Sequence, residues 1–241
     1  MQATDQDPLI AALLEQLQVM RAAEHDIFGS LDPEIRDRPM RPNDWSPKDH
    51  QAHLTAWKGI QAERIRASTR GEDPPFVGTE TDEINAGLQA TRADWSWPDV
   101  VAEADEVTKQ LGDEIRAAGS ARLVESGGLI GGIFGNGASH AMTHFGWLVE
   151  ADIGVDQARV SAFVDDQERL LNAEGLPDFD RGVGLYNLAC AHALAGRLDR
   201  ARPLLRLAFP LRPDLADFAK QDPDLVELRD ELPTLAGLTS T

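Results

Sequence analysis

The sequence predicts an all-α fold, in which a four-helix bundle at residues 1–155 is followed by a helical hairpin region at residues 156–241. Apolar residues recur every three or four positions through the long segments, as in amphipathic helices that face a core. Two segments, "SPKD" and "SWPD", carry the cap and the proline that are typical of a helix start. No segment alternates apolar and polar residues as a half-buried strand does.

The first two helices of the bundle are marked by apolar spacing and by a cap. A first helix over residues 8–28 is predicted by apolar residues at intervals of three and four, namely Leu9, Leu13, Leu17 and Met20. Ser46 is the expected N-cap of the second helix, Pro47 suits its first position, and Asp49 completes a capping box. The second helix is therefore expected to begin at Pro47.

One face of this second helix carries candidate functional residues. His50, His53, Trp57 and Ile60 follow one another at intervals of three and four, so they share a face. This places His53 inward, beside large apolar groups, with His50 nearer the rim.

The remaining helices of the bundle follow in order. "TRGEDPPFVG" predicts a connection, a third helix should begin near Thr81, and a long helix capped by Ser96 should end at Gly119. The glycine-rich "ESGGLIGGIFGNG" lacks the ending of a phosphate-binding loop, and we interpret it as a flexible lead-in. It leads to a helix that carries His140 and His144.

The C-terminal region has a different pattern. After a helix in "RVSAFVDDQERLLNAEG", small residues recur at regular intervals, and Gly196 separates two helical patterns, with Pro213 as a stop signal. A helical hairpin is expected. Cys190 is the single cysteine, which excludes an intramolecular disulfide, and its alanine-rich helix indicates a packing role.

Composition excludes several classes of partner. With 41 acidic and 23 basic residues the formal charge is -18, so a nucleic acid or an anionic membrane surface is not expected as a partner. The first twenty residues contain no Lys or Arg, and the apolar run "LIAALL" is short, so neither a signal peptide nor a membrane span is expected. The sequence therefore predicts a cytoplasmic protein.

Three histidines predict a metal site. His140 and His144 are four residues apart, so on a helix they lie on the same face. His53 from another helix of the bundle could complete a set of three imidazoles and leave a position open for water or substrate. The alternative is that each histidine hydrogen-bonds a carbonyl or faces water. Next to this site, Trp57, Trp147 and His50 are the candidate substrate-binding residues.

The segments "NDWSPKDHQAHLTAW", "DEINAGL" and "SHAMTHFGWL" resemble the DinB-like superfamily of four-helix bundles over roughly residues 5–155. The resemblance is closest to the colibactin self-protection branch (the ClbS/DfsB type). It implies a divalent metal, often zinc or nickel, held by the matching residues His53, His140 and His144. That branch opens a strained cyclopropane hydrolytically, and other branches resemble thiol-dependent transferases or isomerases that use mycothiol or bacillithiol at the metal.

The C-terminal stretch resembles a terminal tetratricopeptide-type (TPR-like) unit over about residues 182–232. Such units need about three repeats to form an independent groove. This one is therefore expected to pack on the bundle, to cap the open side of the site, or to join two subunits of a homodimer.

Three functions remain open at this point. The first is a metal-assisted hydrolase or thiol-dependent transferase that acts on a reactive electrophile, in self-resistance or detoxification. The second is a binding protein that sequesters a small molecule in a cleft lined by Trp57, Trp147 and Phe145, without turnover. The third is an adaptor that recruits a protein through the TPR-like tail. No catalytic acid or base is assigned, because Asp49 is already a cap and Glu150 is expected to face solvent.

Overall fold

The computed structural model describes residues 7–40 and 44–237, so Asn43, with which the first resembling segment begins, lies outside the described residues. Across these ranges the elements are helices, with a single isolated bridge between Met40 and Trp45 and no strand. The predicted all-α fold is confirmed. No helix in the described part of the chain combines the length and the apolar character that crossing a membrane requires.

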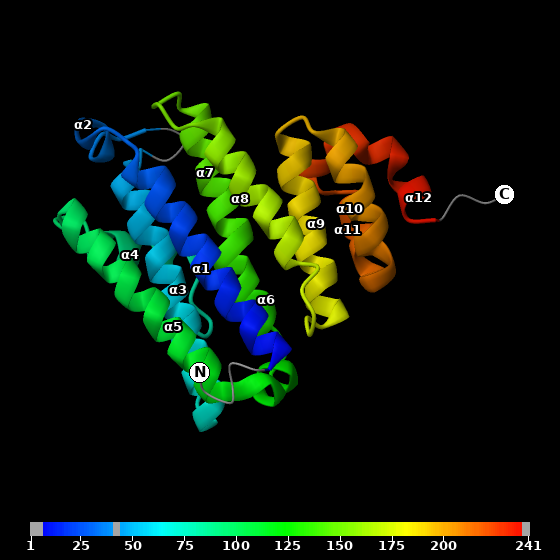
Figure 1. The fold of residues 1–241 in the computed structure, drawn as a ribbon, viewed down its shortest axis with the longest axis horizontal. Helices are drawn as coiled ribbons and strands as arrows, with labels where there is room; N and C mark the ends of the chain where they lie inside the picture. The colour runs from blue at the N-terminus through cyan, green and yellow to red at the C-terminus, as the bar shows by residue number, and fades with distance from the viewer. Residues whose placement is uncertain (1–6, 41–43, 238–241) are drawn as a thin grey trace. The chain divides into compact units, whose positions relative to one another are not determined.

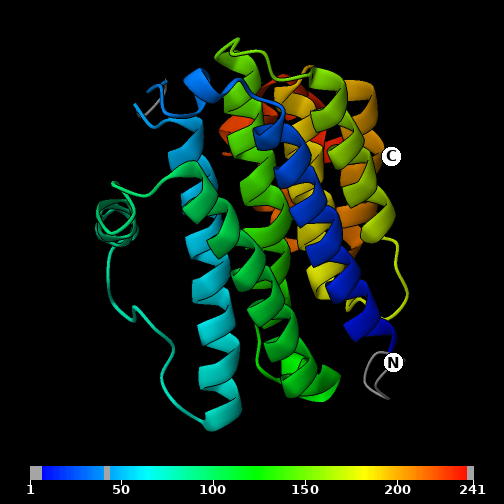
Figure 2. The same cartoon turned by 60° about the vertical axis from the view of Figure 1, so that its left-hand side comes forward.

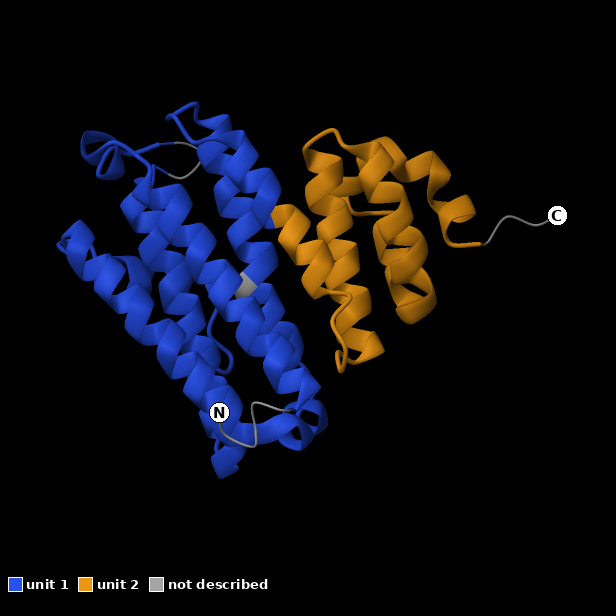
Figure 3. Ribbon diagram, in the orientation of Figure 1, with its two compact units in different colours: residues 1–163 blue, residues 164–241 orange. Residues whose placement is uncertain are grey.

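The chain divides into two compact units, residues 1–163 and 164–241 (Figure 3). The division falls inside the helix α8, Gln157–Leu170, whereas the sequence predicts a domain boundary between residues 155 and 156.

The first unit is built around long helices that run side by side (Figures 1 and 2). Its elements before α8 are α1 (Pro8–Gly29), α2 (Pro33–Arg36), α3 (Pro47–Arg70), α4 (Thr81–Ala90), α5 (Trp97–Glu125), α6 (Leu129–Phe134), the π-helix η2 (Gly135–Ser139) and α7 (His140–Glu150). Figure 2 shows α4 end-on, outside the row of long helices and joined to them by extended connections.

α3 has more buried residues than any other helix of this unit. It begins as expected, with Ser46 as N-cap and with both halves of the capping box between Ser46 and Asp49 formed. It ends at Gly71, whose φ of 69° is the left-handed conformation that favours glycine. Fourteen of its residues are buried, and six of these are the polar side chains His50, Gln51, His53, Thr55, Lys58 and Gln61. A helix that buries so many polar groups must pair them with neighbouring helices.

The long helix α5 departs from the sequence prediction at its C-terminal end. Gly119 has a φ of 70° and a ψ of 161°, so regular helix geometry is interrupted there, as its expected role as a terminator requires. The helix nevertheless resumes and continues to Glu125, because Leu123 is buried against the core. The predicted end at Gly119 is therefore a kink.

The prediction of a flexible lead-in before His140 is wrong. Residues 129–139 form α6 and η2, which continue directly into α7. Ile130 and Ile133 are buried, and a β-carbon at Gly132 would overlap the amide of Gln61 on α3. At that position glycine serves close helix packing, and Gln61 Nε2 donates a hydrogen bond to the carbonyl of Leu129 at 3.0 Å. A π-turn inside an α-helix is often found at functional sites, and this one immediately precedes His140.

The second unit contains the expected helical hairpin. α9 (Asp178–Leu194) and α10 (Leu198–Leu211) are joined through Gly196, whose φ is 71°. Four alanines of this hairpin are buried, as close helix approach requires: Ala189, Ala193, Ala201 and Ala208. The shorter elements α11 (Asp214–Ala219), η3 (Pro223–Glu231) and α12 (Leu232–Leu235) follow. The identity of this second unit as a TPR-like unit stays a prediction.

Cys190 is buried in this unit, within a small hydrogen-bonded cluster. Tyr186 Oη donates to Asp222 Oδ2 at 2.6 Å, and Cys190 Sγ lies 3.8 Å from the same oxygen. Asp222 Oδ1 also accepts the backbone N–H of Asp224 at the start of η3. Burial and Asp222 raise the pKa of the Cys190 thiol, so the thiol stays protonated and ties α9 to η3.

Candidate metal centre

Three imidazole rings from two helices meet inside the first unit. His53 lies on α3, two turns after its N-cap, and His140 and His144 lie one turn apart at the start of α7. The Nε2 atom of His140 is 3.0 Å from His53 Nε2 and 3.1 Å from His144 Nε2. The structure therefore brings together the three residues that the sequence assigns to a metal.

The donor set fits a divalent metal better than it fits mutual hydrogen bonds. Each Nε2 has in its ring plane either one lone pair or one hydrogen, so His140 Nε2 cannot pair well with two nitrogens at once. Nitrogens bound tetrahedrally to one Zn²⁺ at about 2.0–2.1 Å lie about 3.3 Å apart, close to the observed separations. The candidate ligand atoms of all three residues lie within 4.8 Å of one another.

The rings are neutral at physiological pH, as metal ligands must be. Burial lowers the pKa of His53 to about 3 and the pKa of His140 to about 4, from an ordinary value of 6.5. Burial and the neighbouring imidazoles also lower the pKa of His144. Nearby positive charge adds to the effect, because Lys58 lowers the pKa of His140. Each ring thus offers a lone pair without having to lose a proton.

A fourth imidazole, His50, adjoins this triad, but not as the sequence predicts. The expectation that His50 lies nearer the rim than His53 is wrong, because His50 is 0% exposed and His53 is 8% exposed. His50 Nδ1 lies 2.6 Å from His144 Nδ1. His50 is therefore fully buried against the ring of His144, and this position argues against direct contact between His50 and a substrate.

Three tryptophans surround the histidines. The ring of Trp57 lies 6.3 Å from the rings of both His53 and His140, and the ring of Trp147 lies 4.9 Å from that of His144. Trp45 is 4.7 Å from His53, a position that the sequence did not assign to the site. Its signal was present, because the residue before the N-cap of α3 lies close to the first turns of that helix.

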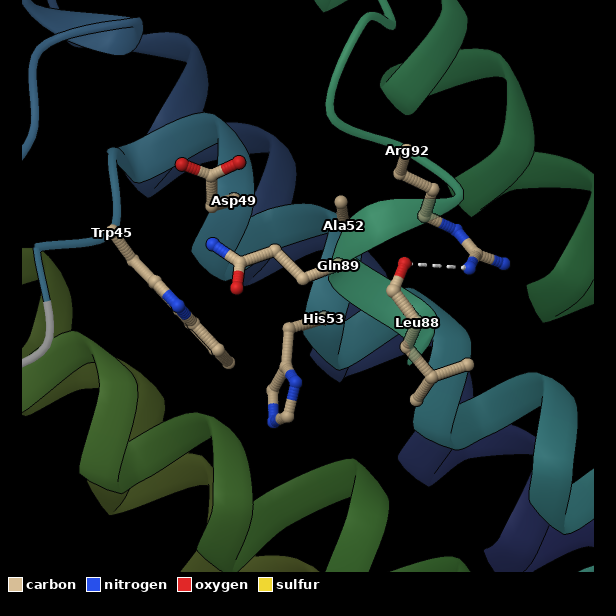
Figure 4. Close-up of a pocket in the computed structure, with 7 residues that line it drawn as sticks. All are labelled: Trp45, Asp49, Ala52, His53, Leu88, Gln89 and Arg92. Atoms are coloured by element: carbon tan, nitrogen blue, oxygen red, sulfur yellow. Dashed lines mark hydrogen bonds between the residues drawn. The ribbon is translucent and has the colours of Figure 1, made fainter. Parts of the chain in front are cut away.

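A small pocket opens beside His53 (Figure 4). It is lined by Trp45, Asp49, Ala52, His53, Leu88, Gln89 and Arg92. In Figure 4 the rings of Trp45 and His53 lie next to each other, the side chain of Gln89 points toward Trp45, and Leu88 and Arg92 lie on the opposite side of His53. Asp49 is occupied as a cap, since its Oδ2 accepts from Ser46 N at 2.8 Å and from Ser46 Oγ at 2.7 Å. Glu150 is exposed, as the sequence predicts.

The contribution of α4 and its following turn was missed from the sequence. Arg92 hydrogen-bonds Glu103 through both Nε, at 2.9 Å, and Nη2, at 2.7 Å, which fixes its guanidinium at the pocket. Trp57 Nε1 donates to Asn85 Oδ1 at 3.0 Å and so ties α4 to α3. The direction in which a short amphipathic helix returns over the bundle is a tertiary property that local spacing does not contain.

A buried ion pair joins Lys58, on the same helix as His53, to Glu24 on α1. Lys58 Nζ is 2.7 Å from both carboxylate oxygens of Glu24, and both side chains are 0% exposed. Gln51 Nε2 donates to Glu24 Oε2 at 3.2 Å, and Arg21 lies 3.6 Å from the same oxygen. The Glu24 carboxylate is therefore the counter-charge of Lys58, whose positive charge acts on His140 of the triad.

The comparisons with known proteins agree with this geometry. The model of the DinB superfamily matches residues 16–148, a stretch that covers more than half of the chain and contains all three histidines of the triad. Neither the curated proteins nor the solved structures gave a match. With a helical bundle that joins a histidine of α3 to a histidine pair on α7, the chain belongs to the DinB superfamily.

Proposed function

We propose that the first unit is a metal-dependent enzyme in which His53, His140 and His144 hold a zinc or nickel ion. The reaction is a hydrolysis or a thiol transfer on a reactive electrophilic small molecule, in the manner of a detoxification or self-resistance enzyme. The observation that carries the proposal is the convergence of three neutral imidazoles, in which His140 Nε2 lies 3.0 Å from His53 Nε2 and 3.1 Å from His144 Nε2. Membership of a superfamily whose members commonly bind divalent metals supports it.

The residues around the triad suit such a reaction. A bound divalent ion would supply a Lewis acid that lowers the pKa of water or of a low-molecular-weight thiol. Three protein ligands leave further positions open, as catalytic metal sites require. Trp45, Trp57 and Trp147 cover the histidines with apolar surface and limit the access of bulk water. The pocket beside His53 brings a small open space to one histidine of the triad.

The metal is tested by elemental analysis of the protein purified without a histidine tag. We expect zinc, nickel or iron near one ion per chain, and loss of this ion in His53→Ala, His140→Ala and His144→Ala. His25→Ala is the matched control, because His25 is exposed on α1 and should leave the metal content unchanged. A folded wild-type protein that binds none of these ions, even after incubation with them, would overturn the proposal.

Turnover is tested with strained electrophiles, namely epoxides and activated cyclopropanes, with and without an added thiol. A hydrolase converts them without the thiol, whereas a transferase requires it, and both activities should disappear in His53→Ala. Retention of the probes by the metal-loaded protein without conversion would instead indicate a binding protein. If the metal-loaded protein neither converts nor retains the epoxides and cyclopropanes, the result favours the adaptor function of the second unit.

A further inference from the structure

The two ring nitrogens of His144 face different partners. Its Nε2 faces the triad, 3.1 Å from His140 Nε2. Its Nδ1 faces away from the triad and lies 2.6 Å from Nδ1 of His50, at hydrogen-bonding distance. If Nε2 binds the metal, the contact with His50 is therefore the hydrogen bond made by the outer nitrogen of a ligand.

The direction of this hydrogen bond follows from the chemistry of imidazole. A neutral histidine that binds a metal through Nε2 must carry its hydrogen on Nδ1. His144 Nδ1 therefore donates, and His50 Nδ1 accepts. His50 then carries its own hydrogen on Nε2, which is buried and has no hydrogen-bond partner in the described part of the chain. One assignment of tautomers thus satisfies both the metal and the short contact.

His50 is held firmly enough to orient its neighbour. It lies three residues before His53 on α3, so the same helix supplies a ligand of the triad and the partner of another ligand. Its side chain is fully buried, and its ring lies 5.5 Å from the ring of Trp45 and 5.9 Å from that of Trp147. The capping box at Ser46 fixes the helical turn from which it projects.

We propose that His50 is a positioning residue, which accepts a hydrogen bond from His144 Nδ1 and thereby holds His144 in the tautomer and orientation that bind a metal through Nε2. This inference rests on the proposed metal site and adds the residue that prepares one of its ligands. In most metal sites a carboxylate, a carbonyl or a water fills this role. Here the acceptor is an imidazole, which, unlike a carboxylate, would add no negative charge beside a ligand of the metal.

The test compares Zn²⁺ affinities, measured by competition with a chromogenic chelator. Loss of an outer partner of a ligand weakens metal binding by about 10- to 100-fold, and we expect this loss in His50→Leu. His50→Asn should bind within a few-fold of the wild type, because its amide oxygen lies near the position of the lost Nδ1. His50→Gln should not be rescued, since its amide reaches the position of Nε2. The Asn and Gln variants keep the site polar, so the comparison stands even if His50→Leu does not fold.

Two further readouts separate positioning from packing. Nitrogen-15 NMR of the zinc-loaded wild type should show the hydrogen of His144 on Nδ1, in a hydrogen bond that is lost in His50→Leu. The melting temperature of metal-free His50→Leu should change little, because the variant removes one unpaired nitrogen, His50 Nε2, and leaves another, His144 Nδ1.

Each possible failure has its own signature. Equal Zn²⁺ affinity in the wild type, His50→Leu and His50→Gln would overturn the positioning role and leave the metal site standing. Complete loss of binding in His50→Asn, as in His53→Ala, would show that His50 is itself a ligand and would also overturn the inference. A wild-type protein without Zn²⁺ affinity would overturn the proposed function and this inference together.

Discussion

At the level of single residues, the buried pair of Glu24 and Lys58 has unequal partners. In the described part of the chain, Lys58 donates its hydrogen bonds to the Glu24 carboxylate alone, whereas Glu24 also contacts Gln51 and Arg21. Removing one member of a buried pair costs about 3–5 kcal/mol, because the other charge stays desolvated. Glu24→Leu should therefore destabilise the protein by about this amount, and Lys58→Met should cost less. Urea denaturation measures both free energies of unfolding.

The double variant Glu24→Leu/Lys58→Met gives the control for this prediction. It should be more stable than Glu24→Leu alone, since it leaves no buried lysine without a counter-charge. Lys109→Ala removes an exposed lysine paired with Asp113 and should leave the free energy of unfolding unchanged. Equal losses in the two single variants would contradict the asymmetry.

His192 in the second unit predicts a pH dependence of stability. Its ring is buried, and its Nδ1 accepts a hydrogen bond from Arg197 Nε at 3.0 Å. Burial, together with the positive charges of Arg197 and Arg200, lowers the pKa of His192 to about 4. The carboxylates of Glu168 and Asp165 oppose this shift. The unfolded chain therefore binds this proton more readily, and stability present above pH 6.5 is lost as pH falls toward 4. The lowered pKa corresponds to roughly 3 kcal/mol of stability above pH 6.5.

The measurement compares the wild type with His192→Leu by urea denaturation between pH 7.5 and 4.5. The variant should be the less stable protein at pH 7.5, because Arg197 loses an acceptor, and the difference should shrink as the pH falls. His25→Leu, at an exposed position of α1, is the control and should follow the wild type at every pH. A difference that grows on acidification would show the opposite sign and refute the argument.

Residue types and their spacing predict part of the candidate site but not all of it. His140 and His144 could be paired from their spacing alone, and His53 could be placed inward from the apolar residues of its helix face. The full burial of His50 could not be predicted in this way, because it depends on Trp45 and Trp147, which approach from other parts of the chain. The pairing of Glu24 with Lys58 joins residues on two helices, and helix periodicity leaves such partners open.

At the level of secondary-structure elements, caps were the most reliable signal. Ser46 and Ser96 begin α3 and α5 with complete capping boxes, as their sequences predict, because these bonds are local. Glycine was the least reliable signal. Gly196 and Gly71 end helices at positive φ, whereas Gly132 lies within a helix, because it packs against Gln61. Which role a glycine has depends on a neighbour that the local sequence does not name.

The packing of α6 against α3 gives a prediction about this element. Gly132→Val should destabilise the protein by about 1–3 kcal/mol through overpacking, because its side chain displaces Gln61 and disturbs the hydrogen bond to Leu129. Since α6 and η2 lead directly to His140, the variant should also bind Zn²⁺ more weakly. Urea denaturation and chelator competition measure the two effects.

Gly87→Ala on α4 is the matched control, because apart from the adjacent residues and backbone of its own helix nothing lies within 4 Å of a β-carbon at Gly87. Alanine is the better helix former by about 0.5–1 kcal/mol, so this variant should be slightly more stable and should bind Zn²⁺ as the wild type does. Wild-type stability in Gly132→Val would show that Gln61 moves aside without cost and would contradict the packing argument.

At the level of the whole molecule, the net charge of -18 complicates any measurement of metal binding. An acidic surface attracts every divalent cation, so weak stabilisation by added metal says little about the triad. The triad offers nitrogen donors, which suit Zn²⁺ and Ni²⁺, whereas Mg²⁺ and Ca²⁺ prefer oxygen. Selectivity among these ions therefore separates the site from the surface charge.

We expect Zn²⁺ at one hundred times its dissociation constant to stabilise the protein by about 2.7 kcal/mol, as mass action requires of a ligand that binds only the folded state. Mg²⁺ at the same concentration should have no comparable effect, and a chelator should reverse the stabilisation. Thermal unfolding measures the shift, and hydrogen exchange should place the added protection on α3 and α7, which carry the three histidines. The shift should vanish in His53→Ala and persist in His25→Ala. Equal stabilisation by Mg²⁺ and Zn²⁺, or a shift that survives in His53→Ala, would assign the effect to surface charge and remove the triad as its cause.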